Sequence, residues 1–230
     1  MLLPCLELQT SPEPQYSLII LHGLGADGED FLPVCKALRL KDLQGGMRFV
    51  LPSAPDLPIS RHNGYVMRAW YDLRPDGVLP REDEAGARAS QTRIDALIQR
   101  EMTRGIASEH IFLMGFSQGC AMALMTGLRF PHRLGGIIAL SGYLPAPDTT
   151  ASERHPANAA TPIFMAHGRE DDVVPIARGW HARDVLSQLG SPVSWHDYPM
   201  DHTLCLDEIR AIDRWIGEQA ASASPQPGSI

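Results

Sequence analysis

A serine between two glycines, at the junction of two contrasting segments, constrains the fold of this chain most strongly. The run Gly115–Gly119 (GFSQG) follows a short apolar stretch, 110–114, and precedes the small, helix-forming residues 120–125. A strand that turns directly into a helix crowds the backbone at the turn, and glycine on each side of the serine relieves that crowding. The pattern predicts a sharp turn with Ser117 exposed at its tip. A serine that merely caps the helix fits the same pattern.

Short apolar runs alternate with helix-forming segments along the chain, which predicts an α/β fold with a mostly parallel sheet and helices on both faces. The inner runs are continuously apolar, as expected for buried parallel strands. A long loop is expected over about 52–82, and no helix is expected between the fifth and sixth strands. The expected strands lie near 4–9, 17–21, 47–51, 110–114, 135–141, 162–167 and 192–198, and the expected helices near 29–40, 83–104, 118–129, 176–189 and 204–219.

Length and composition set further limits. The 230 residues favour one domain over 1–219, followed by a flexible Ala/Ser/Pro/Gly-rich tail at 220–230. A net charge of −7 disfavours nucleic-acid binding. No apolar run of membrane-spanning length and no basic, apolar leader is present, which argues against stable membrane insertion or a signal peptide. Four cysteines without C-x-x-C spacing suit reduced thiols in a cytoplasmic protein.

An acidic loop and a histidine follow the serine along the chain, and each comes directly after an expected strand. Asp171 and Asp172 follow the strand at 162–167, and His202 follows the strand at 192–198. A hydroxyl is a weak nucleophile at neutral pH, so an imidazole must take its proton, and a carboxylate must orient that imidazole. The sequence predicts Ser117 as nucleophile and His202 as general base and then acid, with either aspartate as the orienting group.

The segment His22–Gly28 (HGLGADG), after the expected strand at 17–21, is the second glycine-rich loop of interest. In a fold of this type one oxyanion donor is the N–H after the nucleophile, here Gln118, and the other lies in the loop after an early strand, here Leu24. The glycines also match a dinucleotide-binding fingerprint. That alternative needs an acidic residue after the next strand, and Pro52-Ser53 stands there instead. A P-loop is excluded because no G-K-[ST] follows.

Taken together, these motifs resemble the carboxylesterase / acyl-protein thioesterase family (phospholipase/carboxylesterase) of α/β hydrolases, over about Tyr16 to Ile216. The segments that carry the resemblance are Leu21–Gly25, Pro52–Pro55, Met67–Leu73, Gly115–Gly119, Leu140–Pro145, His167-Gly168 with Asp171, and His202. The resemblance implies an α/β-hydrolase fold without a large cap domain, no metal or cofactor, and hydrolysis of esters or thioesters. It also selects Asp171 over Asp172, because the family's acid lies four residues before a proline, here Pro175.

The resemblance also places the long loop beside an acyl groove. The residues expected to contact substrate are Met67, Trp70, Tyr71, Tyr143 and Val173. A tryptophan such as Trp70 equally suits a core or loop-packing position. Two residues depart from the family pattern: Asp201 stands where relatives usually have Gly before the histidine, and Arg68 stands where they often have Pro. Both departures concern substrate preference and leave the expected catalytic groups in place.

The predicted function is that of a serine carboxylesterase that cleaves carboxylic esters through an acyl-enzyme on Ser117. An acyl-protein thioesterase or lysophospholipase with longer acyl substrates uses the same chemistry and is the alternative. A binding protein that has lost catalysis is the remote alternative, because a fold alone does not establish function. The expected partner is a small acyl ester or thioester, and a homodimer is compatible with the sequence.

Overall fold

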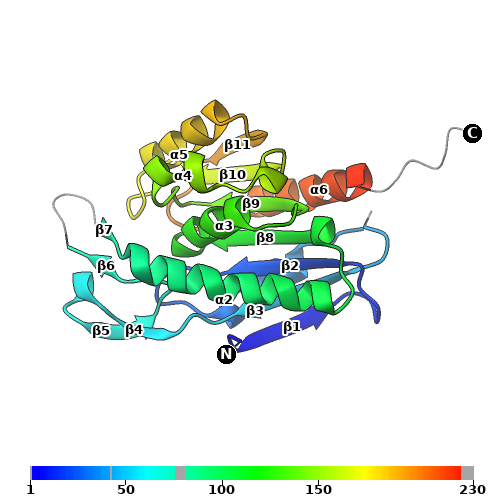
Figure 1. Cartoon of the computed structure of the whole chain (residues 1–230), viewed down its shortest axis with the longest axis horizontal. Helices are drawn as coiled ribbons and strands as arrows, with labels where there is room; N and C mark the ends of the chain where they lie inside the picture. The colour runs from blue at the N-terminus through cyan, green and yellow to red at the C-terminus, as the bar shows by residue number, and fades with distance from the viewer. Residues whose placement is uncertain (1, 42, 76–80, 224–230) are drawn as a thin grey trace, which may run out of the picture.

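The computed structural model describes residues 2–41, 43–75 and 81–223. Its centre is a seven-stranded sheet with the order β1-β3-β2-β8-β9-β10-β11 (Figure 1). β1 is antiparallel to β3, and every other neighbouring pair is parallel. The strands are β1 (Cys5–Gln9), β2 (Tyr16–Leu21), β3 (Met47–Pro52), β8 (Ile111–Phe116), β9 (Gly136–Leu140), β10 (Ile163–Gly168) and β11 (Val193–Tyr198).

Helices cover both faces of the sheet, and alternate strand residues supply the two cores. In β2, Leu18 and Ile20 pack with the helices of one face, whereas Ile19 and Leu21 pack with those of the other. Trp215 completes the first core with edge contacts to Phe112 and Phe164. The first face carries α1 (Leu32–Ala37) and α6 (Leu206–Ala223), and the second carries α2 (Glu84–Thr103), α3 (Gln118–Arg129) and α5 (Ile176–Gln188).

All the expected strands are present within a residue or two, which confirms the mostly parallel sheet with helices on both faces, and the residues that the structure describes form no large cap. The expectation of one long loop over 52–82 needs correction, because the described part of this segment contains two small antiparallel strand pairs. These are β4 (Asp56–Ile59) with β5 (Tyr65–Arg68), and β6 (Leu73–Arg74) with β7 (Arg81–Glu82). The strands are too short for a periodic pattern. Asn63 and Gly64, both with positive φ, form the turn of the first pair, and Asn-Gly is a hairpin signal in its own right.

Three features of the helices also differ from expectation. The gap between the fifth and sixth expected strands contains α4 (Pro147–Glu153), which is too short to show a clear apolar period. The helix expected at 29–40 divides into a 3₁₀ turn at 28–31 and α1. At the carboxyl end, α6 continues to Ala223, past the expected start of the tail at 220, while 224–230 lie outside the described residues. No helix in the described ranges has the length and apolar character of a membrane span.

The fold gathers four strand ends at one edge of the sheet. β2, β8, β10 and β11 are parallel members of the same sheet, so their carboxyl ends all point in one direction (Figure 1). The loops after these strands are the ones that carry the predicted oxyanion donors, nucleophile, acid and base. In open α/β sheets this edge is where ligands bind.

Candidate active site

The turn between β8 and α3 holds Ser117 in an uncommon backbone conformation. Its φ of 55° and ψ of −117° lie in a region that side chains normally avoid, and its N–H donates to Leu140 O at 2.9 Å. A Cβ on Gly115 would overlap the carbonyl of Gly119, and a Cβ on Gly119 would overlap the carbonyl of Leu21. Both glycines are therefore required by sterics, and the turn presents Ser117 beyond the strand end.

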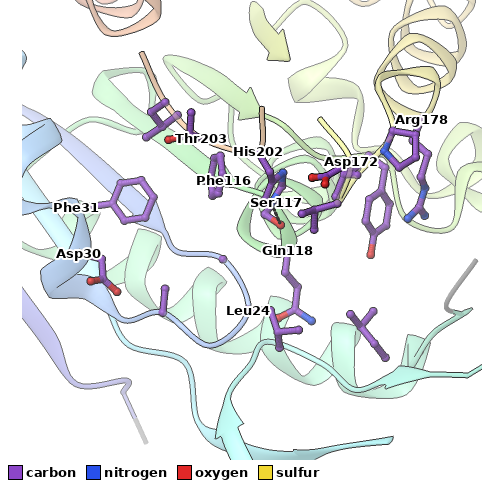
Figure 2. A pocket seen from close by; sticks show the side chains of 18 of the residues that line it. Leu24, Asp30, Phe31, Phe116, Ser117, Gln118, Asp172, Arg178, His202 and Thr203 are labelled. Atoms are coloured by element: carbon purple, nitrogen blue, oxygen red, sulfur yellow. Dashed lines mark hydrogen bonds between the residues drawn. The ribbon is translucent and has the colours of Figure 1, made fainter. Parts of the chain in front are cut away.

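Three distant side chains converge at this turn. Nε2 of His202 lies 2.9 Å from Oγ of Ser117, and Nδ1 of His202 lies 2.7 Å from Oδ2 of Asp171. The ring of Phe116 packs against the imidazole, with ring centroids 4.8 Å apart. With the Nδ1 proton donated to Asp171, Nε2 is free to accept the serine proton. The structure thus brings together the predicted nucleophile, base and acid. Figure 2 shows Ser117 beside His202.

The acid loop after β10 presents one of its two aspartates to the histidine. The side chain of Asp171 is fully buried, and its Oδ1 accepts the backbone N–H groups of Val173 at 3.0 Å and Val174 at 2.7 Å. His167 donates from Nε2 to Val174 O at 2.8 Å, and burial lowers its pKa, so that it braces the loop in the neutral form. Asp172 is exposed and lines the cavity instead, because the side chains of successive residues point in different directions.

The two predicted oxyanion donors are backbone N–H groups on two loops that meet at the cavity, with Gln118 directly after Ser117 and Leu24 in the loop after β2. Gln118 is the first residue of α3, where an N–H has no acceptor within the helix. The Leu24 N–H has no protein acceptor in the described part of the chain. His22 holds the loop of Leu24, because its Nδ1 donates to Gly23 O at 2.7 Å and its Nε2 accepts the N–H of Ala54 at 2.9 Å. Burial lowers the pKa of His22, which keeps Nε2 available as an acceptor.

Trp70 and Tyr71 require a correction, because both are fully buried and neither lines the cavity beside Ser117. The indole Nε1 of Trp70 donates to His22 O at 2.8 Å. The side chain of Gln118 accepts the Trp70 N–H at 2.9 Å and donates to Tyr71 O at 2.8 Å. These two residues support the catalytic turn and the loop of Leu24 from the side away from the cavity. Their expected role as substrate contacts is wrong. For Trp70 the packing position is the alternative given above, whereas no such alternative was expected for Tyr71.

A cavity of about 800 Å³ opens over Ser117 (Figure 2). Of the expected contacts, Tyr143 and Val173 line it, whereas Met67 does not. Apolar side chains dominate the wall, with a few charged groups between them. The lining residues that the sequence reasoning missed include Asp30, Phe31, Val34, Arg61, His62, Leu73, Phe116, Arg178, Thr203 and Leu204. Phe116 and Leu73 lie in segments that carry the resemblance, but no motif assigns any of these side chains to a cavity wall, because a residue can face a core, solvent or a cavity with the same sequence pattern.

The two departures from the family pattern lie outside the catalytic contacts. Asp201 is exposed, and its carbonyl, with that of Met200, packs so closely on Gly168 that a Cβ there would overlap both. Arg68 donates from Nη1 to Ala54 O at 2.9 Å, and its carbonyl accepts the Gly25 N–H at 2.8 Å. Arg68 therefore supports the loop of the predicted oxyanion donor and is absent from the cavity wall.

Known proteins share this architecture. A family model described as phospholipase/carboxylesterase matches residues 5–219. The chain is 37% identical over 211 residues to acyl-protein thioesterase 1 of Gibberella zeae, across 88% of this chain and 90% of that protein. The crystal structure of Arabidopsis thaliana SOBER1 is 30% identical, with a TM-score of 0.83 over 89% of this chain and 98% of its own. Acyl-protein thioesterase 2 of Zea mays is 25% identical, with a TM-score of 0.83 over 94% and 99%. The chain therefore belongs to the phospholipase/carboxylesterase family, and it shares the α/β-hydrolase fold and the ester-hydrolysing class of that family.

Proposed function

We propose that the chain cleaves carboxylic esters through an acyl-enzyme on Ser117, with His202 as general base and acid and Asp171 as the orienting carboxylate. The observation that carries the proposal is the unbroken contact chain from Ser117 Oγ through the imidazole to Asp171. A protein that had lost catalysis would have no reason to keep a strained serine, an oriented imidazole and a buried carboxylate in contact. This argues against the binding-scaffold alternative.

The proposed reaction proceeds in two halves. The Ser117 oxygen attacks the ester carbonyl while His202 Nε2 takes the hydroxyl proton, and the N–H groups of Leu24 and Gln118 receive the developing oxyanion. The carbonyl re-forms, the C–O bond to the alcohol breaks, and the imidazolium gives its proton to the leaving alkoxide. Water then attacks the acyl-enzyme with the same base, and releases the carboxylic acid and the free serine. Asp171 stays ionised and stabilises the imidazolium in both halves.

The second candidate is a thioesterase or lysophospholipase with longer acyl chains. Two observations favour it: relatives of the chain carry the name acyl-protein thioesterase, and the cavity of about 800 Å³ has a mainly apolar wall. Such a cavity accommodates more than a short acyl group. The same triad would act on a thioester, with a thiolate as the leaving group. Chain length and leaving atom therefore distinguish the two candidates, whereas the catalytic residues do not.

The setting of the reaction is also a proposal. Cytoplasmic action fits the free thiols of Cys5, Cys35, Cys120 and Cys205. A small acyl ester or thioester fits the cavity, while the net charge of −7 disfavours nucleic acid as a partner. Light scattering at several concentrations decides whether two copies of the chain form a homodimer.

A serine-directed fluorophosphonate probe tests the proposed function. The wild-type protein should be labelled covalently, and Ser117→Ala should not be. Labelling that persists in Ser117→Ala would refute the nucleophile assignment. A rate series with p-nitrophenyl esters of increasing acyl length, with one long-chain acyl thioester beside them, then separates the two candidates. A preference for the short esters supports the carboxylesterase, and a preference for the long acyl groups supports the second candidate.

A further inference from the structure

One wall of the cavity holds a cation whose position is fixed by two contacts. Arg178, in the first turn of α5, lines the same cavity as Ser117. Its guanidinium carbon lies 3.5 Å from the centroid of the Tyr143 ring, and its Nη2 donates to Oε1 of Glu82 at 2.8 Å. The arginine side chain is 23% exposed. A planar guanidinium held over an aromatic face and tied at one nitrogen is oriented before any ligand arrives.

The aromatic platform is itself held in place. The hydroxyl of Tyr143 lies 2.6 Å from the hydroxyl of Tyr71, which is fully buried beneath the site. Burial raises the pKa of both phenols, so that they remain neutral hydrogen-bonding groups. The ring therefore offers a rigid, uncharged surface to the guanidinium. Arg178 is thus part of a built wall, in contrast with the exposed side chain of Arg61, a cation on the hairpin at the cavity rim.

The cation of Arg178 faces the cavity, but the carboxylate that pairs with it does not. Its partner Glu82 does not line the cavity, whereas Arg178 does. Among the described residues Nε and Nη1 of Arg178 have no hydrogen-bond acceptor, so at least two donor groups remain for another ligand. Figure 2 shows Arg178 and Asp172 on one side of Ser117 and Phe31 on the other. Apolar residues Leu73, Val174 and Pro175 also line the cavity and suit a short hydrocarbon spacer.

We infer that Arg178 forms, with the Tyr143 ring, a subsite for a negatively charged group of the substrate. The ligand is an ester that carries a carboxylate or phosphate a few carbons from the reacting carbonyl. Guanidinium recognises such planar or tetrahedral oxyanions through charge-assisted hydrogen bonds. The inference rests on the proposed ester hydrolysis at Ser117 and specifies its substrate class. The competing interpretation is that Arg178 only ties α5 to β7 through Glu82.

The test compares matched substrates that differ in one charge. In the first arm the charge lies on the acyl part: mono-p-nitrophenyl glutarate is compared with p-nitrophenyl pentanoate. In the second arm it lies on the alcohol: para-carboxyphenyl butyrate is compared with para-carbamoylphenyl butyrate. The readout is the ratio of kcat/KM for the charged substrate to kcat/KM for the neutral one. The variants are Arg178→Gln, Arg178→Lys and Glu82→Gln, with Arg183→Gln as the control on the same helix.

Arg178→Gln should lower the ratio about tenfold or more in one of the two arms, mainly through KM, because a charge-assisted contact is lost. Arg178→Lys should keep part of the ratio. Glu82→Gln should raise it, because the competing carboxylate is gone. Arg183 stacks over Trp195 and pairs with Asp184, away from the cavity, so its variant should leave the ratio unchanged. The arm that responds identifies the part of the ester that carries the charge.

A purely structural tie predicts a different pattern. Arg178→Gln and Glu82→Gln would then affect charged and neutral esters equally, and an unchanged ratio in both arms would overturn the subsite. If Arg178→Gln does not fold, the opposite responses expected of Arg178→Lys and Glu82→Gln still decide the question. A failure of the proposed ester hydrolysis would give a result that is distinct from both of these patterns. In that case the wild type does not hydrolyse the neutral ester, or Ser117→Ala hydrolyses it equally well.

Discussion

Asp171 contacts His202 through one carboxylate oxygen, at 2.7 Å from Nδ1, while its other oxygen accepts two backbone N–H groups. The second set of contacts fixes the direction of the first. A carboxylate held in this way selects the imidazole tautomer that leaves Nε2 to face Ser117. The side chain of the neighbouring Asp172 accepts no backbone N–H from any residue that the structure describes, and it lies at the cavity although it is only one residue away.

We expect Asp171→Asn to lower kcat about 10⁴-fold, because an amide in place of the carboxylate favours the wrong tautomer. The measurement is the hydrolysis of a neutral p-nitrophenyl ester at neutral pH, with circular dichroism as a check of folding. Asp172→Asn is the matched variant, and its kcat should fall by less than about tenfold. The reverse ranking of the two variants would show that the orienting acid was assigned to the wrong residue.

Trp70→Phe should destabilise the protein by about 1–3 kcal/mol, because the carbonyl of His22 loses its buried donor. The loss is expected in the free energy of unfolding from urea titrations. The control is Trp180→Phe on α5, where the tryptophan is 44% exposed and a change within about 0.5 kcal/mol is expected. Equal effects of the two variants would contradict the bracing role of Trp70.

Gly119→Ala should prevent the chain from adopting the native turn, because the new methyl group would overlap the carbonyl of Leu21, which lies in the central sheet. We expect a loss of soluble protein, or a loss of more than about 4 kcal/mol, the range of severe core disruption. Gly217→Ala is the matched change in α6. A Cβ at Gly217 meets no atom within 4 Å, and alanine there should stabilise the helix by up to about 1 kcal/mol. A stable, active Gly119→Ala protein would disprove the steric argument.

Glu208 gives the chain a pH-dependent stability. Its carboxyl is fully buried near the start of α6, and burial raises its pKa from 4.5 to about 8. Since the folded state binds this proton more tightly than the unfolded state, its contribution is fully present below pH 4.5 and is lost as the pH rises through 8. Glu208→Gln should therefore be more stable than wild type at pH 8, by about 1–3 kcal/mol.

Urea unfolding of both proteins at pH 5 and pH 8 checks this prediction. The difference in the free energy of unfolding between Glu208→Gln and wild type should be larger at pH 8 than at pH 5. A difference that is the same at both pH values would mean that Glu208 ionises freely in the folded protein. Asp207→Asn is the matched control, because that neighbour is largely exposed and should leave the pH dependence as it is.

The sequence predicted the sheet well because its buried parallel strands are continuous apolar runs bounded by glycine or polar residues, as in β8 and β10. It also predicted which side chains meet. Ser117, Asp171 and His202 each follow a parallel strand, and the carboxyl ends of such strands share one edge of the sheet. Their catalytic roles remain predictions, which Ser117→Ala and Asp171→Asn test for two of the three residues.

Other features depend on contacts that no local pattern encodes. Trp70 could face substrate or core, and its burial follows from hydrogen bonds to His22 and Gln118, which lie 48 residues away on either side. Arg178 reads as an ordinary helix residue, and only the packing of α5 against Tyr143 brings it to the cavity. The β4–β5 hairpin, in contrast, does have a local signal, because Asn63-Gly64 is a turn sequence that predicts a hairpin.

The cavity wall and the catalytic turn come largely from different parts of the chain. Phe31 and Val34 precede β3, Arg61 and Leu73 lie between β3 and α2, and Arg178 lies in the first turn of α5. Within the described ranges, none of these residues donates a hydrogen bond to Ser117, Asp171 or His202. New substrate preferences can therefore arise by exchange of wall residues while the reacting centre stays intact, which makes this chain a convenient starting point for engineering ester selectivity.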